Sequence, residues 1–400
     1  MKPRKLIGIL LFAIFISLAI SSTGVWAKKG GNGDSKGGGG NDDGGDGGGS
    51  GAVCAGTENP TPTMTYVGPF KDQGDFYTQD IMLASTSGCD TYVLLSEAAQ
   101  QLYDKRGFPG DLVSTVRNLR MDVRNGKGIV IWVDIALDPW PVLGMRFELD
   151  SSGRPFNVSD PEPLYLPRDP QRVVSSTDVR LNEEGQAELV VRERFAVYTS
   201  EAQVVTVNVD SVEDDWEVLP QPDCNLAPCF EVVGFVWWNQ EGDGIYFETR
   251  NLANSEFGYA RFRQTPTGWE PELVVSDDGV DFLGINSDEY LLLRRLIPIY
   301  NKGGKLVGRQ PEIRMFDPEL CVPNGCHFED GPIFSYEQGW TGQNGWMPDG
   351  GLLIPQPGSE FDAELQKIDP NSREPGDFLL MIGGNRSTSF GWDTSFGLQD

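Results

Sequence analysis

Short apolar runs rich in β-branched and aromatic residues alternate with clusters of Gly, Asp, Asn and Pro along most of the chain beyond residue 54. The runs recur about every ten positions, which is typical of an all-β sandwich, barrel or propeller. Clear examples are residues 128–134, 187–192, 204–209 and 231–238. The pattern therefore predicts an all-β fold with little helix.

One short helix is expected after Ser96. This serine can cap it, and alanines and Leu102 follow at helical spacing. The Gly-Phe-Pro-Gly sequence that begins at Gly107 would end it.

One hairpin recurs along the chain: an apolar strand, a turn with Asn or Pro followed by acids and Gly, and a second apolar strand. Its copies lie near residues 124–129, 181–189, 238–245, 285–291 and 346–352. They are about 55 residues apart, a spacing that suits four-stranded propeller blades. We therefore predict an all-β, six-bladed β-propeller of four-stranded blades. The first unit lacks an innermost strand, and residues 387–393 can supply it, so a C-terminal strand is expected to join the first blade and close the ring.

Two segments resemble a known repeat. The sequence Trp-Met-Pro-Asp-Gly-Gly-Leu at residues 346–352 resembles the Ser-Pro-Asp-Gly box of TolB-like propeller repeats. Residues 79–84 followed by 92–95 resemble the second half of the same repeat. The resemblance covers most of residues 60–396 and implies a six-bladed ring in an export compartment that binds a protein or ligand. TolB carries an additional N-terminal α/β domain, where this chain has a Gly-rich segment.

The N-terminus predicts export. Basic residues precede an apolar stretch of about fifteen residues, which is short for a membrane span, and Ala27 completes a signal-peptidase site. We expect a signal peptide at 1–27, a flexible Gly/Asp-rich linker at 28–53 and the propeller domain at 54–400. The expected location is secreted or periplasmic, with no membrane span after cleavage.

Charge and composition exclude several functions. The 400 residues include 59 Asp+Glu, 32 Lys+Arg and a single His, for a net charge of −27. Such a chain repels phosphate backbones and anionic lipid, so a nucleic-acid partner is not expected. One His rules out His-rich metal sites and most His-based acid–base chemistry.

The cysteines predict three disulfides. An even number of cysteines in an exported chain is typical of a disulfide framework. Two pairs have four intervening residues, and the remaining two cysteines flank the first hairpin. The expected pairs are Cys54–Cys89, Cys224–Cys229 and Cys321–Cys326.

Carboxylates are the remaining candidates for chemistry. Four aspartates are expected to face the central channel: Asp122, Asp178, Asp281 and Asp393. Paired carboxylates would suit a carbohydrate-active hydrolase or lyase, and acid clusters also supply the oxygen ligands of Ca²⁺, so a calcium-stabilised surface protein is a further alternative. Outside the Gly-rich linker the sequence has no G-x-S-x-G nucleophile elbow, and it has no sialidase Asp-box. Its only histidine, His327, lies in a cysteine loop. The favoured prediction is a monomeric, non-enzymatic propeller without a cofactor that binds a protein or glycan partner through its loop face or channel. Trp140, in a Pro-rich loop, would either contact such a partner or pack in the core.

Overall fold

The computed structural model describes seventeen segments of the chain, all within one compact unit that spans residues 51–400. They are residues 61–68, 71–74, 76–85, 91–102, 116–196, 202–211, 215–221, 229–239, 241–252, 255–277, 279–285, 290–322, 324–335, 352–357, 362–368, 375–383 and 390–392. The predicted signal peptide and linker lie outside these residues. No helix of the described segments is long and apolar enough to cross a membrane.

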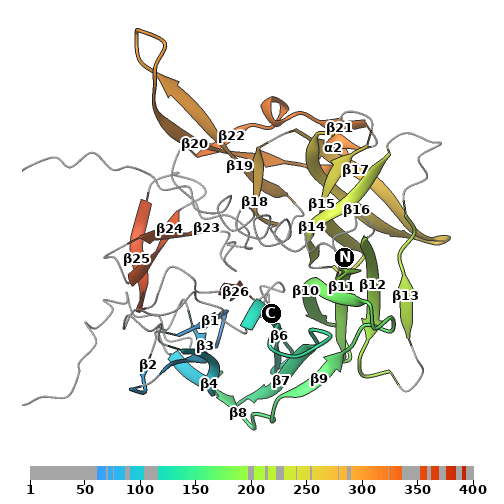
Figure 1. Cartoon of the computed structure of the whole chain (residues 1–400), viewed down its shortest axis with the longest axis vertical. Coiled ribbons are helices and arrows are strands. Elements are labelled where there is room, and N and C mark those ends of the chain that lie inside the picture. Colours follow the sequence, from blue (N-terminus) through green and yellow to red (C-terminus); the bar gives the residue numbers. More distant parts are fainter. Residues whose placement is uncertain are drawn as a thin grey trace, which may run out of the picture. The chain divides into compact units, whose positions relative to one another are not determined.

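The described strands form six sheets (Figure 1). Sheet I contains β1 (Met64–Val67), β2 (Lys71–Asp72), β3 (Phe76–Ala84), β4 (Thr91–Leu102) and β26 (Phe390–Trp392). Sheet II contains β5 (Val116–Arg124), β6 (Lys127–Asp134), β7 (Val142–Leu149), β8 (Pro155–Phe156) and β9 (Glu162–Tyr165). Sheet III contains β10 (Arg172–Leu181), β11 (Ala187–Phe195), β12 (Ala202–Asn208) and β13 (Trp216–Val218).

The later part of the chain continues in the same way. Sheet IV contains β14 (Phe230–Trp238), β15 (Gly244–Asn251), β16 (Phe257–Thr265), β17 (Gly268–Ser276) and β21 (Asn324–Cys326). Sheet V contains β18 (Val280–Ile285), β19 (Leu291–Tyr300), β20 (Leu306–Phe316) and β22 (Ile333–Ser335). Sheet VI contains β23 (Leu352–Pro357), β24 (Asp362–Ile368) and β25 (Pro375–Gly383). The two short helical segments described are α2 (Pro318–Cys321) and η1 (Phe328–Asp330).

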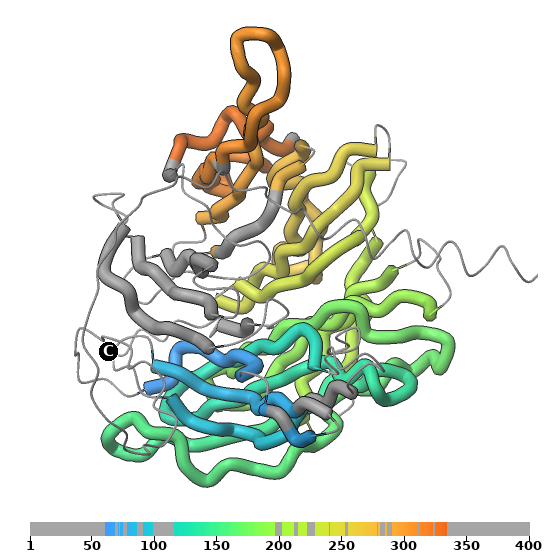
Figure 2. The backbone as a smooth tube through the Cα atoms, turned by 60° about the vertical axis from the view of Figure 1, so that its left-hand side comes forward, coloured from blue at the N-terminus to red at the C-terminus, as the bar shows by residue number. Residues whose placement is uncertain are grey.

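Successive sheets pack face to face. Separate apolar clusters join sheet I to II, II to III, III to IV and IV to V. Neighbouring residues in β14 show how one strand serves two clusters: Trp238 packs toward sheet III and Trp237 toward sheet V. This follows from the alternation of side chains along a strand. Consecutive sheets of mainly antiparallel strands that pack on one another through these clusters make the chain a β-propeller, as predicted (Figure 2).

The two ends of the described chain meet in one sheet. β26 pairs antiparallel with β1, with Met64 opposite Trp392. The prediction that a C-terminal strand joins the first blade is therefore confirmed. This pairing covers an edge of β1 that would otherwise present unpaired backbone groups.

The predicted number of blades is wrong. Among the described residues, five sheets have the four or five strands of a full blade, whereas β23–β25 form a three-stranded sheet. The structure thus has five blades rather than six. The repeated turn pattern identifies hairpins, and a hairpin does not reveal how many further strands pair with it.

The helix predicted after Ser96 is also wrong. Residues 91–102 form β4, which pairs with β3 as far as Phe76 opposite Leu102. The pairing with β3 overrides the weak helical spacing of the alanines. A register irregularity between Gln79 and Ile81 accompanies the positive φ of Glu97, whose N–H donates to Asp80 Oδ1 at 2.9 Å.

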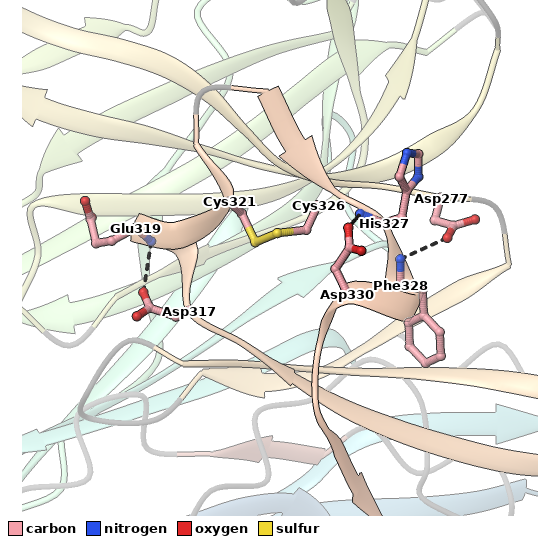
Figure 3. Close-up of a disulfide and its surroundings, with 8 residues drawn as sticks. All are labelled: Asp277, Asp317, Glu319, Cys321, Cys326, His327, Phe328 and Asp330. Carbon is pink, nitrogen blue, oxygen red and sulfur yellow. Dashed lines mark hydrogen bonds between the residues drawn. A yellow bond between two sulfur atoms is a disulfide. The ribbon is translucent and has the colours of Figure 1, made fainter.

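A segment that follows β20 crosses from sheet V to sheet IV. It comprises residues 317–331 and is called the strap below. Its strand β21 adds to sheet IV in parallel with β17, placing Cys326 opposite Val275. The Cys321–Cys326 disulfide closes the strap beside α2 (Figure 3), and this predicted pair is confirmed.

The strap is fastened at both of its ends. Glu319 on α2 accepts from Arg261 Nη2 at 2.6 Å. The N–H of Phe328 donates to Asp277 at 3.0 Å, as Figure 3 shows. His327 and Asp330 bond reciprocally: the His327 N–H donates to the Asp330 carboxylate, and the Asp330 N–H donates to the His327 carbonyl. His327 is exposed and occupies a capping position at η1.

The other predicted disulfides fall mainly outside the described residues. Cys229 is disulfide-bonded, and its predicted partner, Cys224, lies outside the described residues. Cys54 and Cys89 also lie outside them.

Candidate interaction site

Two of the predicted channel carboxylates connect neighbouring blades. Asp122 in β5 and Asp178 in β10 are fully buried. Asp178 Oδ2 accepts the N–H of Trp238, in the first strand of the next blade, at 2.9 Å. Asp122 Oδ2 likewise accepts the N–H of Leu181. The same type of bond therefore joins sheet II to III and sheet III to IV.

A buried arginine lies beside these carboxylates. Arg120 Nε is 3.6 Å from Asp178 Oδ1, and Arg120 Nη1 donates to the carbonyl of Leu119 at 3.1 Å. Burial raises the pKa of Asp178 to about 7, although Arg120 and the N–H of Trp238 oppose this. Burial also lowers the pKa of Arg120. Both effects arise because removal from water disfavours the charged form.

The side chains of the other two predicted carboxylates lie outside what the structure describes. Asp281 lies in β18, where its backbone is opposite Arg294 in β19. Asp393 lies outside the described residues. Asp122 and Asp178 are both closed to solvent, so neither is presented to a ligand in this conformation. Within the described residues, no three His, Cys, Asp or Glu side chains converge as a metal site.

Another buried carboxylate, Glu193, was not predicted from the sequence. Glu193 in β11 accepts from the hydroxyl of Tyr165 at 2.5 Å and from Gln203 Nε2 at 2.7 Å. Tyr165 OH in turn accepts from Trp216 Nε1 at 3.2 Å. Burial, reinforced by Glu193, raises the pKa of Tyr165. Since Tyr165 belongs to β9 and the other three residues to sheet III, the network ties two blades together.

Trp140 also contributes to packing. It lies in the connection between β6 and β7, is half-buried, and contacts the cluster shared by sheets II and III. Its φ of 46° is in the left-handed region, which is uncommon for a residue with a side chain. The guanidinium of Arg194 lies 5.8 Å from the centre of its ring.

The hairpin formed by the second and third strands of sheet V projects beyond the rest of its sheet. Here β19 and β20 extend well beyond their neighbours: β18 pairs with β19 as far as Arg295, and β22 pairs with β20 at Ile313 and Arg314. Past these points no other described strand pairs with β19 or β20, which continue to pair with each other out to Tyr300 opposite Leu306. The resulting two-stranded ribbon projects from the sheet (Figure 1, Figure 2). Residues 298–310, all of them exposed, are called the arm below.

The arm exposes large apolar side chains close together. Ile299 is 43% exposed, Tyr300 60%, Leu306 46% and Val307 60%. Tyr300 and Leu306 are directly opposite each other, so they share one face of the ribbon. A monomeric protein rarely leaves apolar side chains gathered in this way without a binding role.

The turn at the end of the arm is well ordered by its own hydrogen bonds. Asn301 Oδ1 accepts the N–H of Gly303 at 2.9 Å and that of Lys305 at 3.0 Å. Gly304 has a φ of 75°, which a residue with a side chain rarely adopts. The apolar residues are therefore held on a defined hairpin. The same Asn-capped turn closes the hairpin at Asn182, and a turn one residue longer closes the hairpin at Asn239.

Sequence reasoning missed the arm. The alternation of apolar residues and the Asn-Lys-Gly-Gly-Lys turn identify a hairpin at residues 297–307, but every hairpin in the chain has a similar pattern. The ends of β18 and β22 show that, among the described strands, none lies beside the end of this hairpin.

Comparison with known proteins adds little beyond the architecture. No family model matches the chain, and no curated protein matches it. Similar solved structures include TolB from Acinetobacter baumannii, with a TM-score of 0.48 and 9% identity over 83% of this chain and 67% of that one. The periplasmic gluconolactonase PpgL from Pseudomonas aeruginosa has a TM-score of 0.39 and 11% identity over 82% of this chain and 99% of that one. The Dos1 propeller has a TM-score of 0.37 and 10% identity over 83% of this chain and 87% of that one. Such distant likenesses carry no conclusion about activity, and the assignment as a β-propeller rests on the strand pairing and packing described above.

Proposed function

We propose that this chain is an exported, non-enzymatic β-propeller that binds a protein or other macromolecular partner through its loop face, with the arm as the principal contact. The observation that carries the proposal is the gathering of four exposed apolar side chains on a projecting hairpin. Binding interfaces concentrate such residues at their centre and surround them with polar ones. Lys302, Lys305 and Arg309 provide polar surroundings of this kind.

The positions of the carboxylates support a non-enzymatic role. A glycosidase needs two carboxyl groups on either side of an accessible sugar, about 5–9 Å apart. Asp122 and Asp178 are buried and engaged by the backbone of the next blade, so their geometry suits stability better than hydrolysis.

Export is supported by the N-terminal sequence and by the cysteines. The Cys321–Cys326 disulfide is typical of an oxidising compartment. The proposed location is secreted or periplasmic.

The test uses the full chain in its native cells. A photo-cross-linking phenylalanine derivative replaces Tyr300 on the arm and, as a matched control, Leu320 on α2, which is 81% exposed. We expect one discrete adduct from position 300 and none from position 320. An absence of adducts at 300, or the same adducts at both positions, would contradict the proposal.

A further inference from the structure

The charge of the arm is opposite to that of the chain. From Leu291 to Pro311 the sequence contains five Lys or Arg and no Asp or Glu. Three of these basic residues, Lys302, Lys305 and Arg309, lie in the exposed arm. The chain as a whole carries a net charge of −27. An acidic surface is therefore the electrostatic complement of the arm.

The order of residues along the arm indicates a protein surface rather than a membrane. The apolar residues form a band behind the turn, and Lys302 and Lys305 lie in the turn itself. Insertion into a bilayer would drive these two ammonium groups into the hydrocarbon ahead of the apolar side chains, at a cost of about 3 kcal/mol each at the centre. A protein recess with acidic groups at its end accommodates both parts of the arm.

The acidic protein that is certain to be present is the chain itself. We propose that the arm docks on the acidic body of a second copy, so that two copies exchange arms in a closed dimer. The inference rests on the proposed function and names the partner of the same site. It replaces the monomer expected from the sequence.

Symmetry and size are consistent with an exchange of arms. Two arms would repel each other in direct contact because both are basic, so each arm must contact the body of the other copy. A twofold arrangement then lets every copy donate one arm and receive one. The thirteen residues at 298–310, together with a similar receiving surface, make about 20–30 residues a side, the size of a stable interface.

The test measures the oligomeric state of the purified exported chain by sedimentation velocity from micromolar to submillimolar concentration. We expect the wild-type chain to form a dimer at low salt, and changes in the arm to make this dimer dissociate already at a higher protein concentration. Tyr300→Ser combined with Leu306→Ser should weaken the dimer at least tenfold. These side chains are exposed in the single copy, so the fold should be retained, as checked by the thermal midpoint.

Two further variants separate the contribution of the arm's charge from a general effect of surface substitution. Lys302→Glu combined with Lys305→Glu should weaken the dimer and reverse its dependence on salt, since like charges then meet at the interface. Leu320→Ser, the control on α2, should leave the dimer unchanged.

Several results would overturn the inference. A wild-type chain that is monomeric at every concentration refutes self-docking, and so does a dimer that persists in both arm variants. Binding of the wild type, but not of the arm variants, to phosphatidylserine–phosphatidylcholine vesicles would assign the arm to a membrane instead. If the chain is monomeric while Tyr300 cross-links to a different protein, self-docking fails and the proposed function stands. If neither occurs, both fail.

Discussion

The substitution Asp178→Ala tests whether the buried carboxylates hold neighbouring blades together. In the native chain, Asp178 accepts the N–H of Trp238 at 2.9 Å and lies 3.6 Å from Arg120 Nε, with its side chain fully buried. Alanine removes both interactions at once. The Trp238 N–H then has no acceptor from this side chain, and Arg120 loses the carboxylate beside it.

The expected cost is large because both partners are buried. Breaking a buried ion pair by removing one member costs about 3–5 kcal/mol, since the remaining charge stays in the interior. An orphaned buried N–H costs about 1–3 kcal/mol, part of which is already contained in that figure. We therefore expect Asp178→Ala to lower the free energy of unfolding by about 3–5 kcal/mol. Asp178→Asn, which can still accept from Trp238, should cost less.

The assay is urea unfolding followed by tryptophan fluorescence at pH 8, where the Asp178 carboxyl is ionised. Asp160→Ala serves as the control, because Asp160 is exposed and a surface change should stay within about 0.5 kcal/mol. Adding Arg120→Met to Asp178→Ala should recover part of the loss, because the isolated guanidinium is then removed. A cost below about 1 kcal/mol for Asp178→Ala, or no recovery in the double variant, would refute this account of the carboxylates.

Three further outcomes are expected. Burial raises the pKa of Asp178 to about 7, so the native state retains a proton that the unfolded chain releases above about pH 4. The free energy of unfolding should therefore fall as the pH rises between these values, by about 1.4 kcal/mol per unit of pKa difference. In unfolding titrations, Asp178→Asn should lack this fall. Replacing both Cys321 and Cys326 by Ser should lower the free energy of unfolding by about 2 kcal/mol, because the disulfide closes a short loop; an unchanged urea midpoint would contradict this. A calcium-stabilised chain would melt at a lower temperature in EDTA than in Ca²⁺, and equal midpoints in the two would remove that alternative.

The local pattern of the sequence was sufficient for the class of fold. Alternating apolar runs and Asn- or Gly-containing turns act over a few residues, and they identified most strands and the hairpins that join them. The short spacing of Cys321 and Cys326 likewise made their pairing predictable. The pairing of β26 with β1 was predictable for a different reason: the first unit lacked a strand and the C-terminal segment had one to spare.

Features that depend on contacts between distant segments could not be read in this way. The helical spacing after Ser96 was overridden by pairing with β3, and the number of strands in each sheet was set by neighbours that a hairpin pattern does not specify. The sequence suggested that Asp122 and Asp178 face the channel, because a carboxylate in a strand does not reveal which distant backbone N–H will donate to it.

The arm illustrates the same limit most clearly. Its apolar residues have the periodicity of a buried hairpin, and they are exposed only because β18 and β22 end before reaching them. Periodicity records which residues share a face of a strand. Whether that face is covered depends on the length of the neighbouring strands, and therefore only on the tertiary structure.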